Sequence, residues 1–209
     1  MSMVRPARSI ARIAIAASLA AGLAAGPAAG VRAQPSADAP VREAPRPATA
    51  AGKLDALFDK LQNTRDPAEA QRTEAAIWQI WVEPGEPAAG SMMQLALDAQ
   101  QRGDLFGAFA LFDAIIHLKP DFAEGWNRRA TILYQLGRFE DSRKDAEKTV
   151  ELEPRHFGAL AGLGLIAAAK DDDETALDAF GRALSFNPHM AQVRASFDAL
   201  RKKRRNGAI

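Results

Sequence analysis

Apolar residues recur at helical spacing along most of the chain after residue 53. In Asp66–Trp81 they recur three and four residues apart, as on one face of an α-helix: Ala76, Ile77, Ile80 and Trp81. Asp66 and Pro67 predict where this helix begins, because an aspartate accepts hydrogen bonds from free N–H groups and proline fits the first helical position. The same spacing predicts a shorter helix over Leu54–Gln62.

Between residues 89 and 190 the pattern repeats every 34 residues. The shift aligns bulky residues, small residues four positions later, turn residues and prolines. The sets are Met92, Trp126 and Leu160; Ala96, Ala130 and Gly164; Gly103, Gly137 and Asp171; and Pro120, Pro154 and Pro188. The bulky and the small residue lie on one face of the first helix, and the second helix packs into the space that the small residue leaves. Proline then ends the second helix. Three copies of one two-helix unit are predicted.

The period and the residue types resemble the tetratricopeptide repeat, a helix-turn-helix unit of 34 residues. The resemblance covers about half of the chain, in repeats at 89–122, 123–156 and 157–190. It implies an all-α fold, a right-handed α-solenoid of three helix hairpins. Residues 53–88 are expected to add a degenerate N-terminal helix pair that packs on the repeat starting near Ala89, and 191–209 a capping helix with a basic tail.

Three positions depart from the family pattern, and one of them is Asp173, which replaces the aromatic residue of the third repeat. Arg129 replaces the usual leucine, and we expect its stem to pack while its charged head reaches water. Asp171 replaces the glycine at the turn of the third repeat. Aspartate tolerates the left-handed backbone region that such a turn requires, so we expect the turn to persist in a looser form.

The first 33 residues have the features of a signal peptide of a bacterial exported protein. Met1–Arg12 carries three arginines and no acid, Ile13–Ala25 is apolar, and Val31–Ala33 offers a cleavage site before Gln34. The alternative is an uncleaved membrane anchor, since Ile13–Val31 is uncharged and about as long as a membrane span. The stretch is mostly alanine and glycine with a proline inside, which favours cleavage.

Residues 34–52 are predicted to be a disordered linker, because they contain four prolines and almost no large apolar side chain. The 209 residues are 47% hydrophobic and 25% charged, which fits one globular domain with tails. The chain has 27 basic and 26 acidic side chains, and cleavage after Ala33 would remove four arginines and no acid. The small negative charge that results argues against a nucleic-acid partner.

No residue pattern indicates catalysis, a metal or a cofactor. The chain has no cysteine, which excludes disulfides and thiolate metal sites. Its three histidines, His117, His156 and His189, lie about a repeat apart without a carboxylate at ligand spacing. The acidic run Asp171–Glu174 lacks the ligand spacing of a calcium loop and is typical of a helix start. We therefore expect a protein that is not an enzyme and holds no cofactor.

The resemblance implies that a partner binds on the concave face formed by the first helices of the repeats. In the second repeat, the inward positions form a polar strip: Glu124, Asn127, Arg128, Thr131, Tyr134 and Gln135. In the first repeat they include Met93, Gln94 and Leu97. In the third they are small and apolar: Gly158, Ala161, Gly162, Leu165, Ala168 and Ala169. This apolar shelf is either open to a ligand or covered by the C-terminal helix.

One ligand class of the family does not fit the residues of this chain. Repeats that clamp the terminal carboxylate of chaperone tails need lysine, asparagine and arginine at positions where this chain has Met93, Leu97, Gly158 and Gly162.

A last helix is predicted over His189–Asn206, with Val193, Phe197 and Leu200 facing inward. Five consecutive bases lie near its end: Arg201, Lys202, Lys203, Arg204 and Arg205. They complement the negative end of the helix and keep the cap soluble. The alternative is a weak contact with an anionic surface.

The sequence therefore predicts a non-catalytic scaffold in the periplasm of a bacterium, which binds a protein or peptide segment on its concave face. Two alternatives remain. The chain is a structural module anchored to the inner membrane by an uncleaved N-terminus, or an accessory subunit of an envelope enzyme complex.

Overall fold

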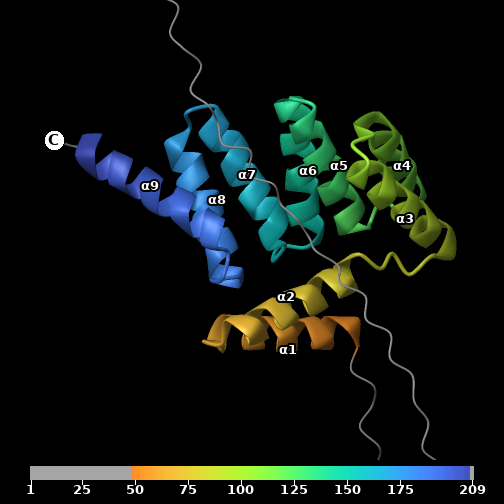
Figure 1. Ribbon diagram of the computed structural model, residues 1–209, viewed down its shortest axis with the longest axis horizontal. Helices are drawn as coiled ribbons and strands as arrows, with labels where there is room; N and C mark the ends of the chain where they lie inside the picture. Colours follow the sequence, from red (N-terminus) through yellow and green to blue (C-terminus); the bar gives the residue numbers. More distant parts are fainter. Residues whose placement is uncertain (1–48, 208–209) are drawn as a thin grey trace, which may run out of the picture. The chain divides into compact units, whose positions relative to one another are not determined.

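The computed structural model describes residues 49–207, which form nine α-helices and no β-strand (Figure 1). The signal peptide and nearly all of the linker predicted above lie outside these residues. The helices are α1 (Ala50–Asn63), α2 (Pro67–Trp81), α3 (Pro87–Gln101), α4 (Leu105–Leu118), α5 (Ala123–Gln135), α6 (Phe139–Leu152), α7 (Phe157–Ala169), α8 (Asp173–Phe186) and α9 (Ala191–Gly207).

The three predicted repeats are three helix hairpins, α3 with α4, α5 with α6, and α7 with α8. Each hairpin turns at a residue in the left-handed region. The φ angles are 79° at Gly103, 75° at Gly137 and 60° at Asp171. The aspartate thus adopts the conformation that glycine adopts in the other two repeats. The all-helical fold and the start of α2 at Pro67, with Asp66 as its N-cap, are confirmed.

In the first and third repeats, small residues on the first helix make room for aromatic rings on the second helix. In the third repeat, a Cβ atom added to Gly164 would lie 2.4 Å from two ring carbons of Phe180, which is fully buried. In the first repeat, Ala96 and Phe112 are both fully buried in one apolar cluster. The knob-and-gap pattern in the sequence therefore sets the distance between the two helices of a repeat.

The first two repeats are joined by an ion-pair network around Arg129. Its Nε and Nη2 atoms donate to the two carboxylate oxygens of Asp145 on α6, at 2.7 and 2.8 Å. Its Nη1 atom donates to Asp113 on α4 of the preceding repeat. The expectation that the arginine head reaches water was wrong, because two carboxylates hold it between the repeats and leave the side chain 16% exposed.

The N-terminal helix pair packs on the third repeat, and the expectation that it packs on the first was wrong. Trp81 of α2 stacks on His156, which precedes α7, with ring centroids 4.2 Å apart. Trp78 packs edge-on against Phe157 and over Gly158, where an added Cβ would come within 2.7 Å of the indole. The first turn of α7 offers the space that two indoles require. Figure 1 shows α1 and α2 lying along the ends of the later hairpins.

The contact between the helix pair and the repeats has an apolar core and polar edges. Its buried members from α1 and α2 are Leu54, Phe58, Leu61, Ala70, Ile77 and Trp81. At the edges, Arg155 donates to Asp55 at 2.7 Å and Gln62 donates to the carbonyl of Ser185 at 3.1 Å. An interface with so many fully buried apolar side chains is part of the folded core.

The last helix, α9, packs on the outer side of the third repeat. Val193, Phe197 and Leu200 contact the cluster around Phe180, as predicted. Along residues 49–207, none of the helices has the length and apolar character needed to cross a membrane.

The packing at Gly164 predicts opposite effects for two similar substitutions. Gly164→Ala forces the Phe180 ring to move and should cost about 1–3 kcal/mol of unfolding free energy. Gly162→Ala lies in the same helix with no atom near the added Cβ, and should stabilise the protein by about 0.5–1 kcal/mol. Urea unfolding monitored by circular dichroism measures both. Equal effects of the two substitutions would contradict the packing described here.

Candidate functional site

The predicted partner-binding residues of the second repeat fall into two groups. Glu124 and Asn127 are buried, and the Arg128 side chain is only 17% exposed. Thr131 and Tyr134 are half-buried and Gln135 is exposed. The first group lies in the N-terminal half of α5 and the second in its C-terminal half, so the two halves have different surroundings.

The Glu124 carboxylate accepts three hydrogen bonds from side chains. Arg128 Nε donates to Oε1 at 2.5 Å, and Asn127 Nδ2 donates to Oε2 at 2.9 Å. His156 Nε2 lies 2.9 Å from the same Oε2 atom. The sequence predicted that Glu124, Asn127 and Arg128 share a face, but it gave no sign that His156, at the end of the same repeat, joins them.

The tautomer of the neutral His156 ring follows from its two contacts. Its Nδ1 atom accepts a hydrogen bond from the backbone N–H of Ala159 at 3.1 Å and so caps the start of α7. The proton of the neutral ring is therefore on Nε2, which donates it to Glu124. The ring is fully buried and stacks on Trp81. A single histidine thus links the cap of α7, the carboxylate of α5 and the docked helix α2.

Glu124 is held as a carboxylate. Burial by itself would raise its pKa, but the charge of Arg128 and the donors His156 and Asn127 outweigh this effect, and the pKa lies below the ordinary value of 4.5. A buried carboxylate that accepts three hydrogen bonds is a stable part of the core.

Trp78 covers this network from the side of α2. The guanidinium of Arg128 lies 5.8 Å from the centroid of the indole, and Gly158 of α7 lies beneath the same ring. Glu124, Asn127 and Arg128 were predicted to bind a partner. In this structure Glu124 contacts His156, Asn127 donates to Glu124, and Arg128 lies against Trp78 of α2. The first turn of the predicted apolar shelf is likewise covered, by α2 and not by the C-terminal helix.

The C-terminal halves of the first helices, together with Gln94, remain accessible. We call these residues the open strip. They are exposed or half-buried and none of them is charged: Gln94, Leu97, Gln101, Thr131, Tyr134, Gln135, Leu165, Ala168 and Ala169. Met93, predicted to lie on the same face, is 1% exposed and belongs to the core of the first repeat.

The other two histidines within residues 49–207 are engaged in structural contacts. His117 contacts the Asp113 carbonyl at 2.8 Å, and His189 contacts the Leu61 carbonyl at 3.0 Å. No group of three or more potential metal ligands occurs in this part of the chain. A pocket of about 210 Å³ between α4, α5 and α6 is lined by Arg129, Arg138 and Lys144, whose charges face Asp141 and Asp145.

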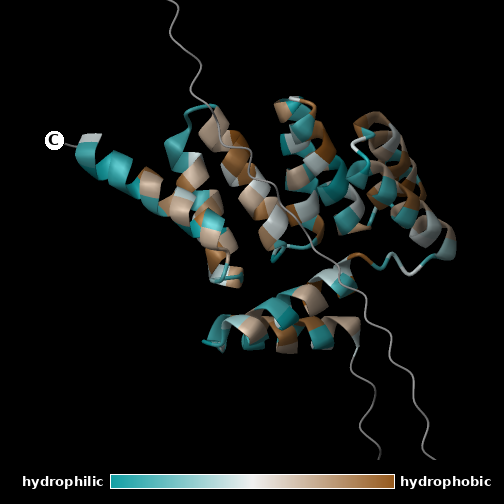
Figure 2. Cartoon of the chain, in the orientation of Figure 1, coloured by the Kyte–Doolittle hydropathy of each residue, from teal (hydrophilic) through white to brown (hydrophobic). Residues whose placement is uncertain are grey.

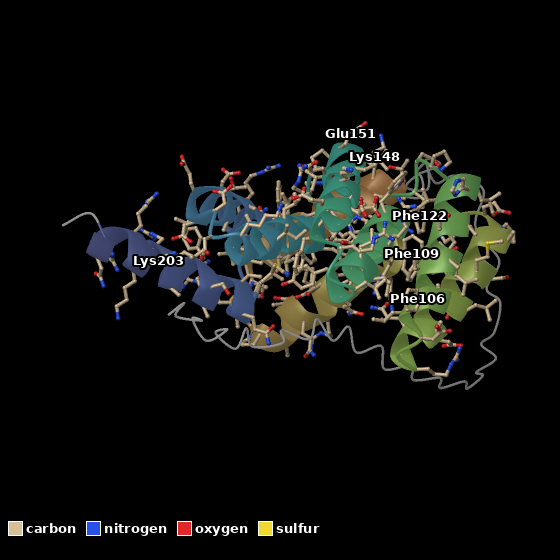
Figure 3. All side chains as sticks on the ribbon, turned by 90° about the horizontal axis from the view of Figure 1, so that it is seen from above. Phe106, Phe109, Phe122, Lys148, Glu151 and Lys203 are labelled. Carbon is tan, nitrogen blue, oxygen red and sulfur yellow. The ribbon has the colours of Figure 1, made fainter. Side chains whose placement is uncertain are left out.

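The five bases near the C-terminus are exposed on the last turns of α9. Lys203 lies 2.5 Å from Asp173, at the start of α8. Figure 3 labels this lysine on α9, whereas the open strip lies on α3, α5 and α7. The basic cluster and the open strip are therefore separate surfaces.

The buried carboxylate predicts a pH-dependent effect of Glu124→Gln. At pH 7 the change should cost about 3–5 kcal/mol of unfolding free energy, because Arg128 loses its buried partner. Since the folded-state pKa lies below 4.5, the contribution of the carboxylate is fully present above pH 4.5 and lost as the pH falls through the folded value. The difference between wild type and variant should therefore shrink in acid.

Urea unfolding at pH 7 and near pH 3 tests this expectation, with Glu147→Gln as the control. Glu147 pairs with Arg143 at the surface, with half of its side chain exposed, and its replacement should change stability by less than about 0.5 kcal/mol. A constant difference for Glu124→Gln at both pH values would show that its charge does not stabilise the fold.

Comparison with known proteins agrees with this architecture. The family model described as "Tetratricopeptide repeat" matches residues 93–148 and 127–191. A TPR repeat-containing protein of Rhizobium etli is 38% identical over 136 residues, which are 65% of this chain and 67% of that protein.

Two solved structures show the same fold. The Arabidopsis OM64 TPR domain has a TM-score of 0.54 at 20% identity, over 56% of this chain and 96% of that domain. The first TPR domain of Spaghetti (RPAP3), bound to the HSP90 peptide SRMEEVD, has a TM-score of 0.53 at 16% identity, over 55% of this chain and 91% of that one. With its three helix hairpins of 34-residue period, this chain belongs to the tetratricopeptide repeat family.

Proposed function

We propose that the protein is a non-catalytic scaffold of the bacterial cell envelope, which binds an uncharged protein segment on the open strip. The observation that carries the proposal is the composition of this strip. Its side chains are amides, a threonine, a tyrosine and small or branched apolar groups, and they lie on α3, α5 and α7, the first helices of three successive repeats. Binding of protein segments by helical repeats is the mode that the fold supports.

The chemistry of the strip suits an extended or helical peptide. Gln94, Gln101 and Gln135 each offer a donor and an acceptor for the backbone groups of a bound segment. Leu97 and Leu165 offer apolar contacts at the two ends of the strip, and Tyr134 combines an apolar ring with a hydroxyl group. Because the strip has no charge, a charged ligand would lose its hydration there without gaining an ion pair. The preferred ligand is therefore neutral.

This ligand differs from the one held by a similar structure. The HSP90 peptide bound to Spaghetti (RPAP3) has the acidic sequence SRMEEVD. In the present chain, Met93 is buried, Leu97 is apolar and Gly158 lies under Trp78. These are positions at which a carboxylate-binding repeat would need basic or amide side chains. An acidic peptide end is for this reason a poor ligand for this protein.

Location in the envelope rests on the sequence of residues 1–33. Their arginines, apolar stretch and small-residue cleavage site are those of an export signal. The anchored module and the accessory enzyme subunit remain alternatives. The weak anionic contact of Arg201–Arg205 also stays a prediction, supported by their exposure on α9.

Selection of ligands from a random peptide library displayed on phage tests the open strip. We expect the enriched peptides to be uncharged, with apolar side chains. The double variant Leu97→Glu and Gln135→Glu should bind a selected peptide at least about tenfold more weakly, because two carboxylates would have to be desolvated. Fluorescence anisotropy of the labelled peptide measures the affinity.

The matched control carries the same added charge on the exposed side of α2, as Gln71→Glu and Gln79→Glu. It should bind as the wild type does. Enrichment of acidic peptides, or equal binding by the strip variant and the control, would place the binding surface elsewhere.

Mass spectrometry of the protein purified from the periplasmic fraction tests the export signal. We expect a mature N-terminus at Gln34. An intact N-terminus in the membrane fraction would favour the anchored alternative, and a full-length chain in the cytoplasm would refute export.

A further inference from the structure

The basic cluster, Arg201–Arg205, carries more positive charge than the end of a helix requires. The negative end of a helix macrodipole is equivalent to only about half a charge, whereas the cluster supplies five consecutive bases. The rest of the described chain has the opposite sign. Residues 49–200 carry 24 acidic and 16 basic side chains, a formal net charge of −8. The charge of residues 49–207 is therefore divided between an acidic body and a basic end.

The basic cluster also projects from the fold. Leu200 is the last residue of α9 that packs on the third repeat, and residues 201–207 are all exposed. Figure 1 shows this end of α9 pointing away from the hairpins, and Figure 2 shows its hydrophilic residues in teal.

Most of the charge of the basic cluster is available to a partner. Within residues 49–207, Lys203 is the only base of the cluster that pairs with a carboxylate, that of Asp173. The Lys203 side chain is still 60% exposed. The guanidinium of Arg201 lies over the ring of Phe197, at 5.6 Å from its centroid, and keeps its charge.

We propose that the basic cluster docks on the anionic headgroups of a lipid bilayer, which the end of α9 approaches end-on. This surface is separate from the open strip, so the proposal goes beyond the binding of a protein segment. The choice of a lipid surface rests on the proposed location in the cell envelope. The anionic character of the partner follows from the charge of the cluster alone.

The arrangement of the bases around the helix favours a flat partner. Successive residues of an α-helix are turned by about 100° and rise by about 1.5 Å, so the five bases surround the helix axis within about 6 Å of its length. A flat surface that is met end-on lies within about one Debye length, about 8 Å, of all five bases. A protein that contacts α9 from the side would meet only about half of them.

The rest of the described chain restricts the contact to the basic cluster. An anionic surface repels the acidic body formed by residues 49–200, which prevents a broader contact. Residues 201–207 include no large apolar side chain, so the contact is electrostatic and does not enter the hydrocarbon. Each base near an anionic bilayer strengthens binding about fivefold. Five bases therefore give a weak contact, with half of the protein bound at about millimolar lipid.

Co-sedimentation with lipid vesicles tests the proposal. The sample is the chain processed at Gln34, because residues 1–33 are themselves basic and apolar. Phosphatidylcholine vesicles with about 40% phosphatidylglycerol should bind the protein, and pure phosphatidylcholine vesicles should not. A rise in NaCl from about 0.05 to 0.5 M should weaken binding at least about tenfold, because salt shortens the Debye length.

Two charge variants locate the contact. Lys202→Gln with Arg205→Gln should weaken binding to the anionic vesicles at least about tenfold, because two of the five bases are lost. Glutamine forms helices about as well as the bases do, so α9 should persist. The control, Lys53→Gln with Arg102→Gln, removes the same charge from exposed positions outside α9 and should bind as the wild type does.

Fluorescence quenching tests the end-on approach. The chain has no cysteine of its own, so a single introduced cysteine can carry a fluorophore. At Asn206→Cys, beside the basic cluster, vesicles with a spin-labelled headgroup should quench the emission. At Gln101→Cys they should not, because Gln101 is exposed on α3, at the opposite end of the array from α9 (Figure 1).

Four results would overturn the proposal. They are an unbound protein on anionic vesicles at low salt, equal binding by the two charge variants, equal quenching at the two cysteines, and tighter binding of RNA or polyglutamate than of vesicles. The last result would assign the cluster to another class of partner. None of them bears on the open strip, which the peptide selection tests independently.

Discussion

The contact of two indole rings with the start of α7 determines the arrangement of residues 49–207. Trp81 stacks on His156, and Trp78 lies over Gly158. These contacts hold α1 and α2 against the third repeat and exclude water from Glu124. Without them, His156 before α7 would lose its stacking partner, and Arg128 of α5 would lose the indole that covers it. The same contact therefore creates the buried network and leaves the open strip as the accessible part of the three first helices.

The buried network shows how apolar and polar packing depend on each other here. A carboxylate without partners is costly to bury, and Glu124 is buried because Arg128, Asn127 and His156 all donate to it. His156 in turn is oriented by the N–H group of Ala159 that it caps. Apolar burial alone would leave the contact between α2 and the start of α7 less specific. The hydrogen-bonded polar groups fix it in one arrangement.

The sequence predicted the repeats well because their spacing has a local cause. The 34-residue period, the alternation of bulky and small residues and the turn residues follow from neighbours in one hairpin. The docking site of α2 depends on residues that are far away in sequence. The apolar face of α2 shows that Ile77 and Trp81 are buried, and it contains no information on their partner. Small residues at Gly158 and Ala161 were a usable signal, since they indicated space at the third repeat. Arg129 shows the same limit, because its two carboxylate partners lie in different repeats.

The position of the N-terminal helix pair also affects how the domain folds and unfolds. In most repeat proteins each unit contacts only its neighbours, so terminal units can fray and folding can spread from any point. Here Asp55 pairs with Arg155, 100 residues later, and Leu61 contacts His189, 128 residues later. Such links close the array into a loop, in which the first helix cannot detach without disturbing the last repeat. This topology favours one cooperative transition and slower folding than an open array of equal length would show.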